Sequence, residues 1–176
     1  MSETLTMALP SEEARSRFEE LYRSSRDDVY AYVATLLRDR TAAEDVTALA
    51  FERAFRRRRL FDARRGSERA WLFGIARNAA LDELRRRGRT VALAAEPEDP
   101  ETAGPGDEAE AALERAALRT ALDQLAPRER EVVALKFFVG LSNEELARVL
   151  KVSPSNAGTI LHRAVQRLRE VCHATP

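Results

Sequence analysis

The sequence predicts an all-α protein built from two small helical domains that a flexible acidic linker joins. Apolar residues recur at three- and four-residue spacing in several segments, which is the pattern of amphipathic helices. Aromatic residues make up only 6% of the chain and glycines number seven, a composition that argues against a β-sandwich. The length of 176 residues suits one ordinary domain or two small ones.

The first domain is predicted over residues 11–90, and it begins with a long amphipathic helix over 11–37. Thr41 is followed three residues later by Glu44, which is the spacing of a capping box. We therefore expect a second helix to begin at Thr41. It carries an apolar face and ends in four consecutive arginines, residues 56–59.

A short glycine-containing loop over residues 61–67 follows the arginines. Ser67 at its end is a good N-cap for a third helix, predicted over residues 71–87. Gly88 directly after that helix is expected to stop it.

Residues 91–108 are predicted to form the linker. The stretch 94–106 consists of small, acidic and turn-forming residues without a large apolar side chain. Such a segment cannot bury enough surface to offset the entropy lost on ordering, so we expect it to be flexible. Its like charges favour an extended chain.

The second domain is predicted over residues 109–174. Four leucines at helical spacing indicate its first helix: Leu113, Leu118, Leu122 and Leu125. Pro127 suits the first position of the next helix, which ends at Gly140. Its apolar residues are Val132, Val133, Leu135 and Phe138.

The end of the chain has the proportions of a helix-turn-helix, with a short helix over residues 143–150 and a longer one after it. Ser142 and Glu145 form a capping box for the first, and Ser153 with Pro154 opens the second. Lys151 occupies the turn, where a left-handed backbone would cost a non-glycine residue about 1 kcal/mol. A plain helical hairpin is the alternative interpretation of this segment.

The second helix of this motif is predicted to present a polar outer face at its amino-terminal end. In a helix-turn-helix protein that end enters the major groove, where Asn and Ser or Thr side chains contact base edges. We expect Arg163 to hold phosphate. The outward residues are Ser155, Asn156, Gly158, Thr159 and His162.

Charge is distributed in blocks, although 29 basic and 29 acidic residues give a net charge of zero. Residues 53–89 carry 13 arginines and four acidic residues, and residues 115–176 carry ten basic and six acidic residues. Residues 90–114 carry eight acidic residues and no basic one. Two basic units around an acidic spacer favour two contacts with a polyanion. The alternative is that arginine is simply the preferred helix-surface residue of a GC-rich genome.

Several functional classes are not expected from the residues present. Cys172 is the one cysteine, which excludes a disulfide framework and a cysteine-cluster zinc site. No apolar run approaches the roughly 18 residues that cross a bilayer, and no signal peptide is recognisable, so we expect a cytoplasmic protein. There is no P-loop, metal-ligand cluster or nucleophile–base motif. We therefore expect no enzyme activity, cofactor, metal or small-molecule substrate.

Three stretches together resemble a known family. They read AAEDVTALAFERAF, RAWLFGIARNAALDELRRRGR, and LAPREREVVALKFFVGLSNEELARVLKVSPSNAGTILHRAVQRLR. In this order and with the acidic spacer, they are similar to an extracytoplasmic-function (group IV) sigma factor of the sigma-70 family. The resemblance implies a sigma-2 and a sigma-4 domain without catalytic activity. It implies core RNA polymerase and promoter DNA as partners, and an anti-sigma factor as a further one.

The resemblance also assigns roles to residues by position. The segment that docks on the polymerase clamp helices would carry Asp45, Leu49, Glu52 and Arg53, whereas Phe51 is better explained as core. The −10 element would be read and opened by the loop over residues 62–69 and the helix after it, with candidates Arg64, Arg65, Ser67, Trp71, Arg77, Asn78, Arg85 and Arg86. The −35 element would be read by Ser155, Asn156, Gly158, Thr159, His162 and Arg163.

The sequence departs from the family in the −35 helix. Where the family commonly has Thr-Val-Lys-Ser-Arg, this chain has Asn-Ala-Gly-Thr-Ile at residues 156–160, and both usual basic positions are neutral. Two other functions therefore stay open. One is a stand-alone helix-turn-helix activator, and the other is an adaptor that keeps the helical scaffold without binding DNA.

Overall fold

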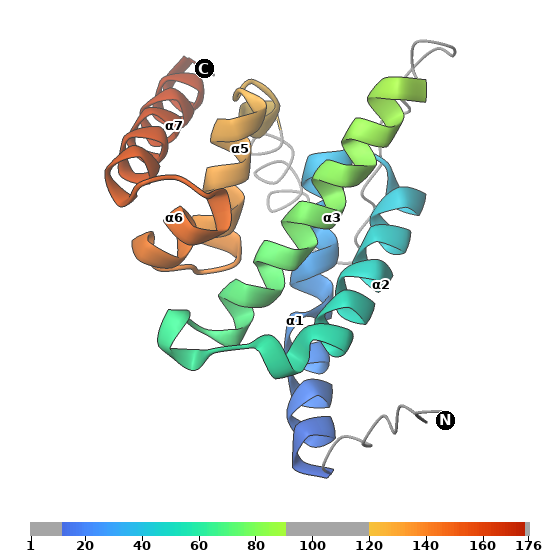
Figure 1. Cartoon of the computed structure of the whole chain (residues 1–176). Helices are drawn as coiled ribbons and strands as arrows, with labels where there is room; N and C mark the ends of the chain where they lie inside the picture. Colours follow the sequence, from blue (N-terminus) through green and yellow to red (C-terminus); the bar gives the residue numbers. More distant parts are fainter. Residues whose placement is uncertain (1–11, 91–119, 175–176) are drawn as a thin grey trace, which may run out of the picture.

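The computed structural model describes residues 12–90 and 120–174 (Figure 1). In the N-terminal unit, residues 12–90, helix α1 (Glu12–Leu37) is followed by α2 (Arg40–Arg57), by the short turns η1 (Arg58–Leu60) and η2 (Ala63–Arg65), and by α3 (Glu68–Thr90). In the C-terminal unit, residues 120–174, a helical end at 120–123 precedes α5 (Pro127–Val133), the π-helical turn η3 (Ala134–Phe138), α6 (Asn143–Leu150) and α7 (Pro154–Ala174).

The described residues contain no strand, which confirms the predicted all-α class. None of the helices in these ranges combines the length and the apolar character needed to cross a membrane. The linker at 91–108 and the leucines at 113 and 118 lie outside the described residues.

The N-terminal unit is a three-helix bundle in which α1, α2 and α3 all contact one another. Val29 and Val33 of α1 and Leu72 and Phe73 of α3 have no exposed surface. Tyr32 meets the edge of Phe73, with ring centroids 5.5 Å apart. Burying side chains of this size stabilises a bundle by about 1.5–3 kcal/mol each. The bundle is thus held by an apolar core to which α1, α2 and α3 all contribute.

The C-terminal unit is organised around the helix-turn-helix of α6 and α7. Leu146 and Ala147 of α6 and Ala157 at the start of α7 are buried in the same apolar cluster, and the small side chain of Ala147 suits a close crossing of the two helices. Val132 and Leu135 form the floor beneath them.

The two predicted domains pack against each other. The buried residues of α1, α2 and α3 and those of α5, η3 and α6 belong to a single continuous apolar cluster. Helix α3 contacts α6, and α1 contacts α5 and η3. Figure 1 shows α5 and α6 lying along one side of α3. We call this the closed arrangement of the two units.

The predicted helix ends are partly confirmed. Ser67 caps α3, because its Oγ accepts a hydrogen bond from the amide of Ala70 (3.1 Å). The N-cap of α2 is Asp39, whose carboxylate accepts from the amide of Ala42 (2.9 Å), so the prediction that Thr41 opens this helix was wrong. Helix α3 also begins before residue 71, and it continues through Gly88 to Thr90.

The capping signals of the helix-turn-helix are confirmed. Ser142 and Glu145 form the expected capping box, and Ser153 accepts from the amide of Asn156 (3.2 Å). Lys151 adopts the left-handed backbone expected at the turn, with φ of 56°. Gly140, which ends the preceding helix, also has positive φ, at 78°.

The helix after Pro127 is not α-helical throughout. Its second half, η3, winds as a π-helical turn, which accommodates one more residue per turn than an α-helix does. Leu135 points into the core, whereas Phe137 and Phe138 are 61% and 59% exposed. Phe138, one of the apolar residues of the predicted helix, therefore lies on its exposed side.

The left-handed turn yields a stability prediction. We expect Lys151→Gly to raise the free energy of unfolding by up to about 1 kcal/mol, because glycine has no Cβ to clash in this conformation. Gly140→Ala has open space around its Cβ, so only backbone strain acts there, and it should lower the free energy of unfolding by about 1 kcal/mol. Urea denaturation measures both, and equal effects of the two substitutions would contradict the argument.

Candidate nucleic-acid interface

The loop between α2 and α3 has a shape set by three of its residues. Asp62 accepts from the amide of Arg64 (3.0 Å) and so starts the turn η2. Gly66 has φ of 134°, a conformation that side chains rarely adopt. Ser67 then caps α3. Arg64 and Arg65 are consequently held on an exposed, tightly turned segment.

A cavity of about 350 Å³ lies beside this loop. Its wall includes Phe61 and Trp71, whose rings are tilted against each other with centroids 5.7 Å apart. Asn78, about two turns after Trp71 on α3, also lines it. Aromatic faces and arginines around a loop are the groups that hold unstacked bases of a single strand.

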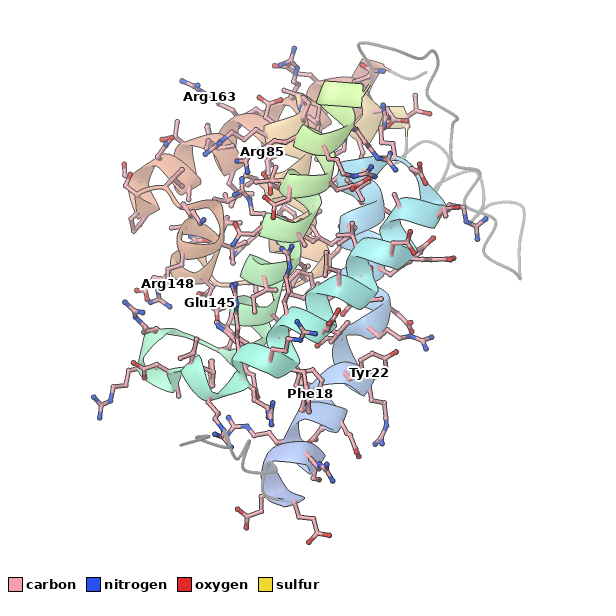
Figure 2. The ribbon with its side chains drawn as sticks, turned by 45° about the vertical axis from the view of Figure 1, so that its right-hand side comes forward. Phe18, Tyr22, Arg85, Glu145, Arg148 and Arg163 are labelled. Carbon is pink, nitrogen blue, oxygen red and sulfur yellow. The ribbon has the colours of Figure 1, made fainter. Side chains whose placement is uncertain are left out.

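Helix α6 of the C-terminal unit contributes Arg148 and Val149 to the wall of the same cavity. Figure 2 shows Glu145 and Arg148 on α6, next to the loop between α2 and α3. Arg148 Nη1 donates to the carbonyl of Arg65 (2.5 Å), and Glu145 Oε1 accepts from the amide of Ser67 (3.2 Å) and from its hydroxyl. Burial disfavours the charged form of Glu145, yet hydrogen bonds from Ser67 and Ser142 prevail and lower its pKa. The carboxylate is thus held ionised against the loop.

Three other residues join the two units in a buried polar contact. Arg77 of α3 pairs with Glu131 of α5, at 2.6 Å from Nε to Oε1, and the hydroxyl of Tyr32 donates to the same oxygen (2.9 Å). All three are at most 8% exposed. Burial, and then the charge of Glu131, raise the pKa of Tyr32 well above its ordinary value.

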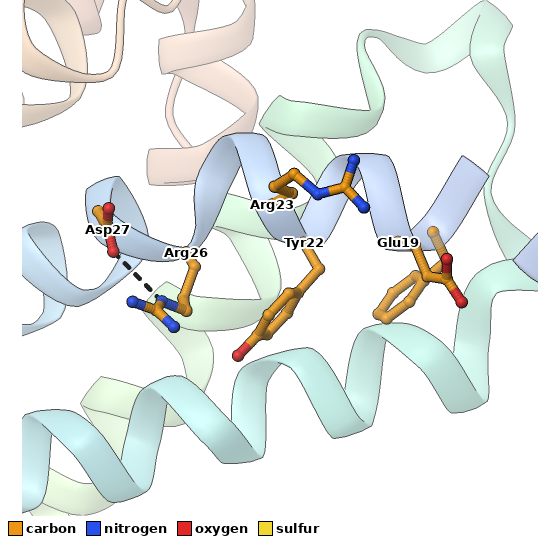
Figure 3. A pocket seen from close by; sticks show the side chains of 6 residues that line it. Glu19, Tyr22, Arg23, Arg26 and Asp27 are labelled. Atoms are coloured by element: carbon orange, nitrogen blue, oxygen red, sulfur yellow. Dashed lines mark hydrogen bonds and ion pairs between the residues drawn. The ribbon is translucent and has the colours of Figure 1, made fainter. Parts of the chain in front are cut away.

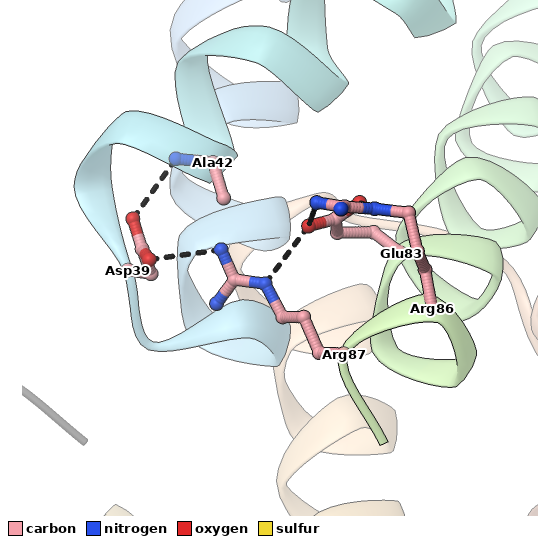
Figure 4. A network of polar contacts seen from close by, with 5 residues as sticks. All are labelled: Asp39, Ala42, Glu83, Arg86 and Arg87. Carbon is pink, nitrogen blue, oxygen red and sulfur yellow. Dashed lines mark hydrogen bonds and ion pairs between the residues drawn. The ribbon is translucent and has the colours of Figure 1, made fainter. Parts of the chain in front are cut away.

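The arginines at the end of α3 are paired with acids of the same unit. Arg85 pairs with Asp82, and Arg86 Nη2 lies 2.6 Å from Glu83 Oε1. Arg87 bridges Glu83 and Asp39, both at 2.8 Å (Figure 4). Hydrogen bonds from Arg86 and Arg87 lower the pKa of Glu83 to about 2.

The candidate docking residues of α2 lie on its outer side. Asp45 and Glu52 are exposed, and Leu49 is half-buried. Arg53 reaches Asp82 of α3, with 3.3 Å between Nη1 and Oδ2. Phe51 is 5% exposed and belongs to the core, as expected.

A groove between α1 and α2 was not anticipated from the sequence. One hollow of about 510 Å³ is lined by Phe18, Tyr22, Arg23, Arg26, Asp27 and Glu19 (Figure 3). A second, of about 380 Å³, continues toward α2. Hydrogen bonds with Tyr22 and Asp27 raise the pKa of Arg26. The buried hydroxyl of Thr47, which lines the second hollow, has no hydrogen-bond partner among the described residues.

The outer face of α7 matches the sequence prediction. Ser155, Asn156, Thr159, His162 and Arg163 are exposed, and Gly158 is half-buried with open space around its Cα. Among the described residues, no group of three His, Cys, Asp or Glu side chains could hold a metal ion.

Comparison with known sequences assigns both units. The model of Sigma-70 region 2 matches residues 21–90, and that of Sigma-70 region 4 matches residues 115–168. The chain belongs to the sigma-70 family. As a member of that family it is an RNA polymerase sigma factor, which directs transcription initiation at promoters.

Individual relatives place it in the extracytoplasmic-function (ECF) group. The RNA polymerase sigma factor CarQ of Myxococcus xanthus is 34% identical over 161 residues, which cover 90% of each chain. The ECF sigma factor SigL of Mycobacterium tuberculosis is 32% identical over 151 residues, which cover 85% of each chain. The ECF sigma factor BldN of Streptomyces coelicolor is 35% identical over 154 residues, but this chain spans only 58% of its length.

Solved structures share the fold. The sigma factor RpoE of Bartonella quintana, in complex with the anti-sigma factor NepR, has a TM-score of 0.75 at 23% identity, over 92% of this chain and 99% of that one. CnrH in complex with the cytosolic domain of CnrY has a TM-score of 0.66 at 25% identity, over 92% and 91%.

In the sigma factor, the residues predicted to contact the −10 element fall into three environments. Ser67, Trp71 and Asn78 meet at the cavity, together with Arg65. Arg85 and Arg86 lie exposed at the far end of α3. Arg77 is buried in its ion pair with Glu131 and does not reach the surface in the closed arrangement.

Sequence reasoning missed Glu131, Glu145 and Arg148 as parts of this region. Glu145 was recognised only as half of a capping box, a role it also has. Glu131 carried a weak signal, since it is a charged residue next to the apolar Val132 and Val133 on a helix that packs into a core.

The ion pairs of Glu83 with Arg86 and Arg87 (Figure 4) yield a prediction about how the free energy of unfolding depends on pH. Because the pKa of folded Glu83 lies below its unfolded value, its stabilisation is full above about pH 4.5 and is lost as pH falls toward 2. We expect Glu83→Gln to lower the free energy of unfolding at neutral pH by about 1–2 kcal/mol, and to flatten its decline between those pH values. Urea titrations measure this. Glu20→Gln, on the exposed side of α1, is the control, and a matching loss there would refute the assignment.

Proposed function

We propose that this sigma factor is a non-catalytic, dissociable specificity subunit of RNA polymerase in the bacterial cytoplasm. Its N-terminal domain, residues 11–90, docks on the core enzyme and opens the −10 element, and its C-terminal domain, residues 109–174, binds the −35 element. Residues 91–108 tether the two. Region 2 and region 4 on one chain carry this proposal, because joint binding of two promoter elements across a tether is an avidity effect.

Docking on the core polymerase involves the outer side of α2. Asp45 and Glu52 offer exposed carboxylates around the half-buried Leu49, and Arg53 lies beside them. An apolar residue surrounded by charged residues on a helix suits a coiled-coil partner, because the apolar side chain can pack against the coiled coil while the charges pair with its charged residues.

Strand opening involves the loop and the front of α3. The cavity beside Ser67, Trp71 and Asn78 offers polar donors and aromatic faces to an unpaired base. Capture of such a base offsets the unstacking cost of a few kcal/mol, so no nucleotide hydrolysis is needed. Arg64 and Arg65 are exposed beside it and would hold the strand's phosphates.

Binding of the −35 element involves α7. Ser155, Asn156 and Thr159 are the exposed side chains that would meet base edges, with His162 and Arg163 further along the helix. Gly158 allows close approach of the backbone to DNA. The neutral residues at 156–160 favour one second candidate, an adaptor that binds polymerase but does not initiate.

Control by an anti-sigma factor is part of the proposal. Two relatives of the same fold, RpoE and CnrH, were solved in complexes with NepR and with the cytosolic domain of CnrY, respectively. We propose that this sigma factor has a protein regulator of that kind.

Run-off transcription with purified core polymerase tests the function. Promoter-dependent initiation is expected only when the core enzyme and this sigma factor are both present. Tight duplex binding by the chain alone would instead support a stand-alone activator. Binding to the core enzyme without initiation would support the adaptor. The double variant Asp45→Ala with Glu52→Ala should lose initiation while its contacts with the promoter stay unchanged. That result would show that the outer side of α2 docks on the core polymerase.

The end of α3 yields a prediction on salt dependence. Arg85→Ala with Arg86→Ala should reduce the log–log salt slope of open-complex formation by about 1–2, because two phosphate contacts and their released counterions are lost. Each arginine is exposed enough to exchange its acidic neighbour for a phosphate. Arg15→Ala, an exposed arginine of α1, is the control. An unchanged slope in the double variant would exclude phosphate contact at this end.

A further inference from the structure

Four consecutive arginines, residues 56–59, span the end of α2 and the start of η1, and the proposed function gives none of them a role. Arg56 pairs with Glu52 of the same helix (2.7 Å). Arg58 Cζ lies 4.0 Å above the ring centroid of Phe55. Arg57 is instead exposed and lines the cavity beside the loop. The arginine run thus contributes one side chain to that cavity.

The side chain of Arg57 is available to a ligand. Within residues 12–90 and 120–174, no hydrogen bond, ion pair or ring contact engages it. A guanidinium presents five N–H donors in a fixed, planar fork and has no acceptor, so it binds best to two acceptor atoms that lie side by side. The cavity wall therefore carries an unused group suited to a ligand with such a pair.

Asp62 adds acceptors to the same cavity. Its Oδ1 accepts from the amide of Arg64 (3.0 Å), and a carboxylate has capacity for further donors. Arg57 and Asp62 form no ion pair with each other, although the structure describes both. One wall of the cavity thus offers a fork of donors, and Asp62 offers oxygens that accept.

Apolar groups complete the site. The tilted rings of Phe61 and Trp71 line the cavity, and so does Leu60, whose side chain is 76% exposed. A base held against these groups loses water from its edges. Each edge atom left without a partner then costs free energy, so the base is selected by how well its hydrogen-bonding atoms are matched.

Guanine matches these groups best. Its O6 and N7 are neighbouring acceptors that a guanidinium contacts with two hydrogen bonds. Its N1–H and N2–H are neighbouring donors that suit the two oxygens of a carboxylate. Adenine and thymine have no two neighbouring acceptors, and cytosine has a single donor group. Any base other than guanine therefore leaves Arg57 or Asp62 incompletely paired.

We propose that Arg57 is a base-reading residue of this sigma factor: its guanidinium makes guanine the preferred base at the position of the −10 strand that the cavity captures, and Asp62 accepts from the N–H groups of the same base. The proposal rests on the function assigned above to the cavity. It adds the chemical identity of the captured base and the residue that selects it.

The first measurement is the affinity of the holoenzyme for single strands. The probes are four fluorescein-labelled oligodeoxythymidines of about 12 nucleotides, with dG, dA, dC or dT at one central position. Core polymerase alone gives the background. The holoenzyme should bind the dG strand about tenfold more tightly than the other three, as a bidentate contact discriminates by that order. Equal affinities, or a preference for another base, would overturn the proposal.

Variants at residue 57 separate base reading from phosphate contact. Arg57→Ala should abolish the dG preference. Arg57→Lys keeps the charge without the fork, so it should bind all four strands well and still lack the preference. Because the Arg57 side chain has no contact within the described chain, neither variant should shift the urea midpoint. If Arg57→Ala weakens all four strands equally and Arg57→Lys restores them fully, Arg57 contacts phosphate only and the proposal is refuted.

Arg56→Ala is the matched control. Arg56 is the adjacent arginine, it pairs with Glu52, and it is not part of the cavity wall. Its removal deletes the same charge, so it should leave the dG preference at about tenfold. A loss of the preference in Arg56→Ala as large as that in Arg57→Ala would assign the effect to charge in general.

Promoter selection separates this proposal from the proposed function. Heparin-resistant open complexes are isolated from a promoter library with a randomised −10 segment, and their DNA is sequenced. Guanine should be enriched at one position of the non-template strand, and Arg57→Ala should remove that enrichment. Open complexes without a guanine preference would overturn the role of Arg57 alone. An absence of promoter-dependent transcripts would overturn the proposed function itself.

Discussion

The ion pair between Arg77 and Glu131 is the contact on which the arrangement of the whole chain depends. Each charge comes from a different domain, and Tyr32 of a third helix completes their hydrogen bonding. A buried charge without its partner is strongly unfavourable, so α5 must seat against α1 and α3 whenever the chain is compact. From that seating follow the shared apolar cluster and the position of α6 at the loop. Arg77, which we predict to contact the −10 element, thus also joins the two domains.

Local signals in the sequence predicted the helices well, because caps depend on residues three positions apart. Ser67, Ser142 and Ser153 all cap the helices expected of them. The exception at α2 is instructive. Thr41 has the right spacing to Glu44, but Asp39 is held at the N-cap by Arg87, which lies 48 residues away in the sequence. A contact so distant leaves no periodic pattern to detect.

The candidate site was predictable in its parts and not in its assembly. The exposed face of α7 follows from helical periodicity, and the loop before α3 follows from Gly66 and Ser67. Burial of Arg77 does not, since its partner Glu131 is 54 residues away and belongs to the other domain. For the same reason Glu145 was recognised as a cap and not as the acid that covers the loop. Which side chains pair between the two domains depends on how the helices pack in three dimensions. No pattern of neighbouring residues in the sequence reveals such a pair.

The π-helical turn η3 has a consequence for the orientation of the helix-turn-helix. Such a turn holds one residue more than regular winding would, and that extra residue lies between α5 and α6. Deleting one residue from 134–138 would restore an ordinary helix, yet everything after it would rotate by about 100° about the helix axis. The angle at which α7 faces outward is therefore set by a winding irregularity in the helix before it. A one-residue change of length here would redirect the motif without altering any of its own side chains.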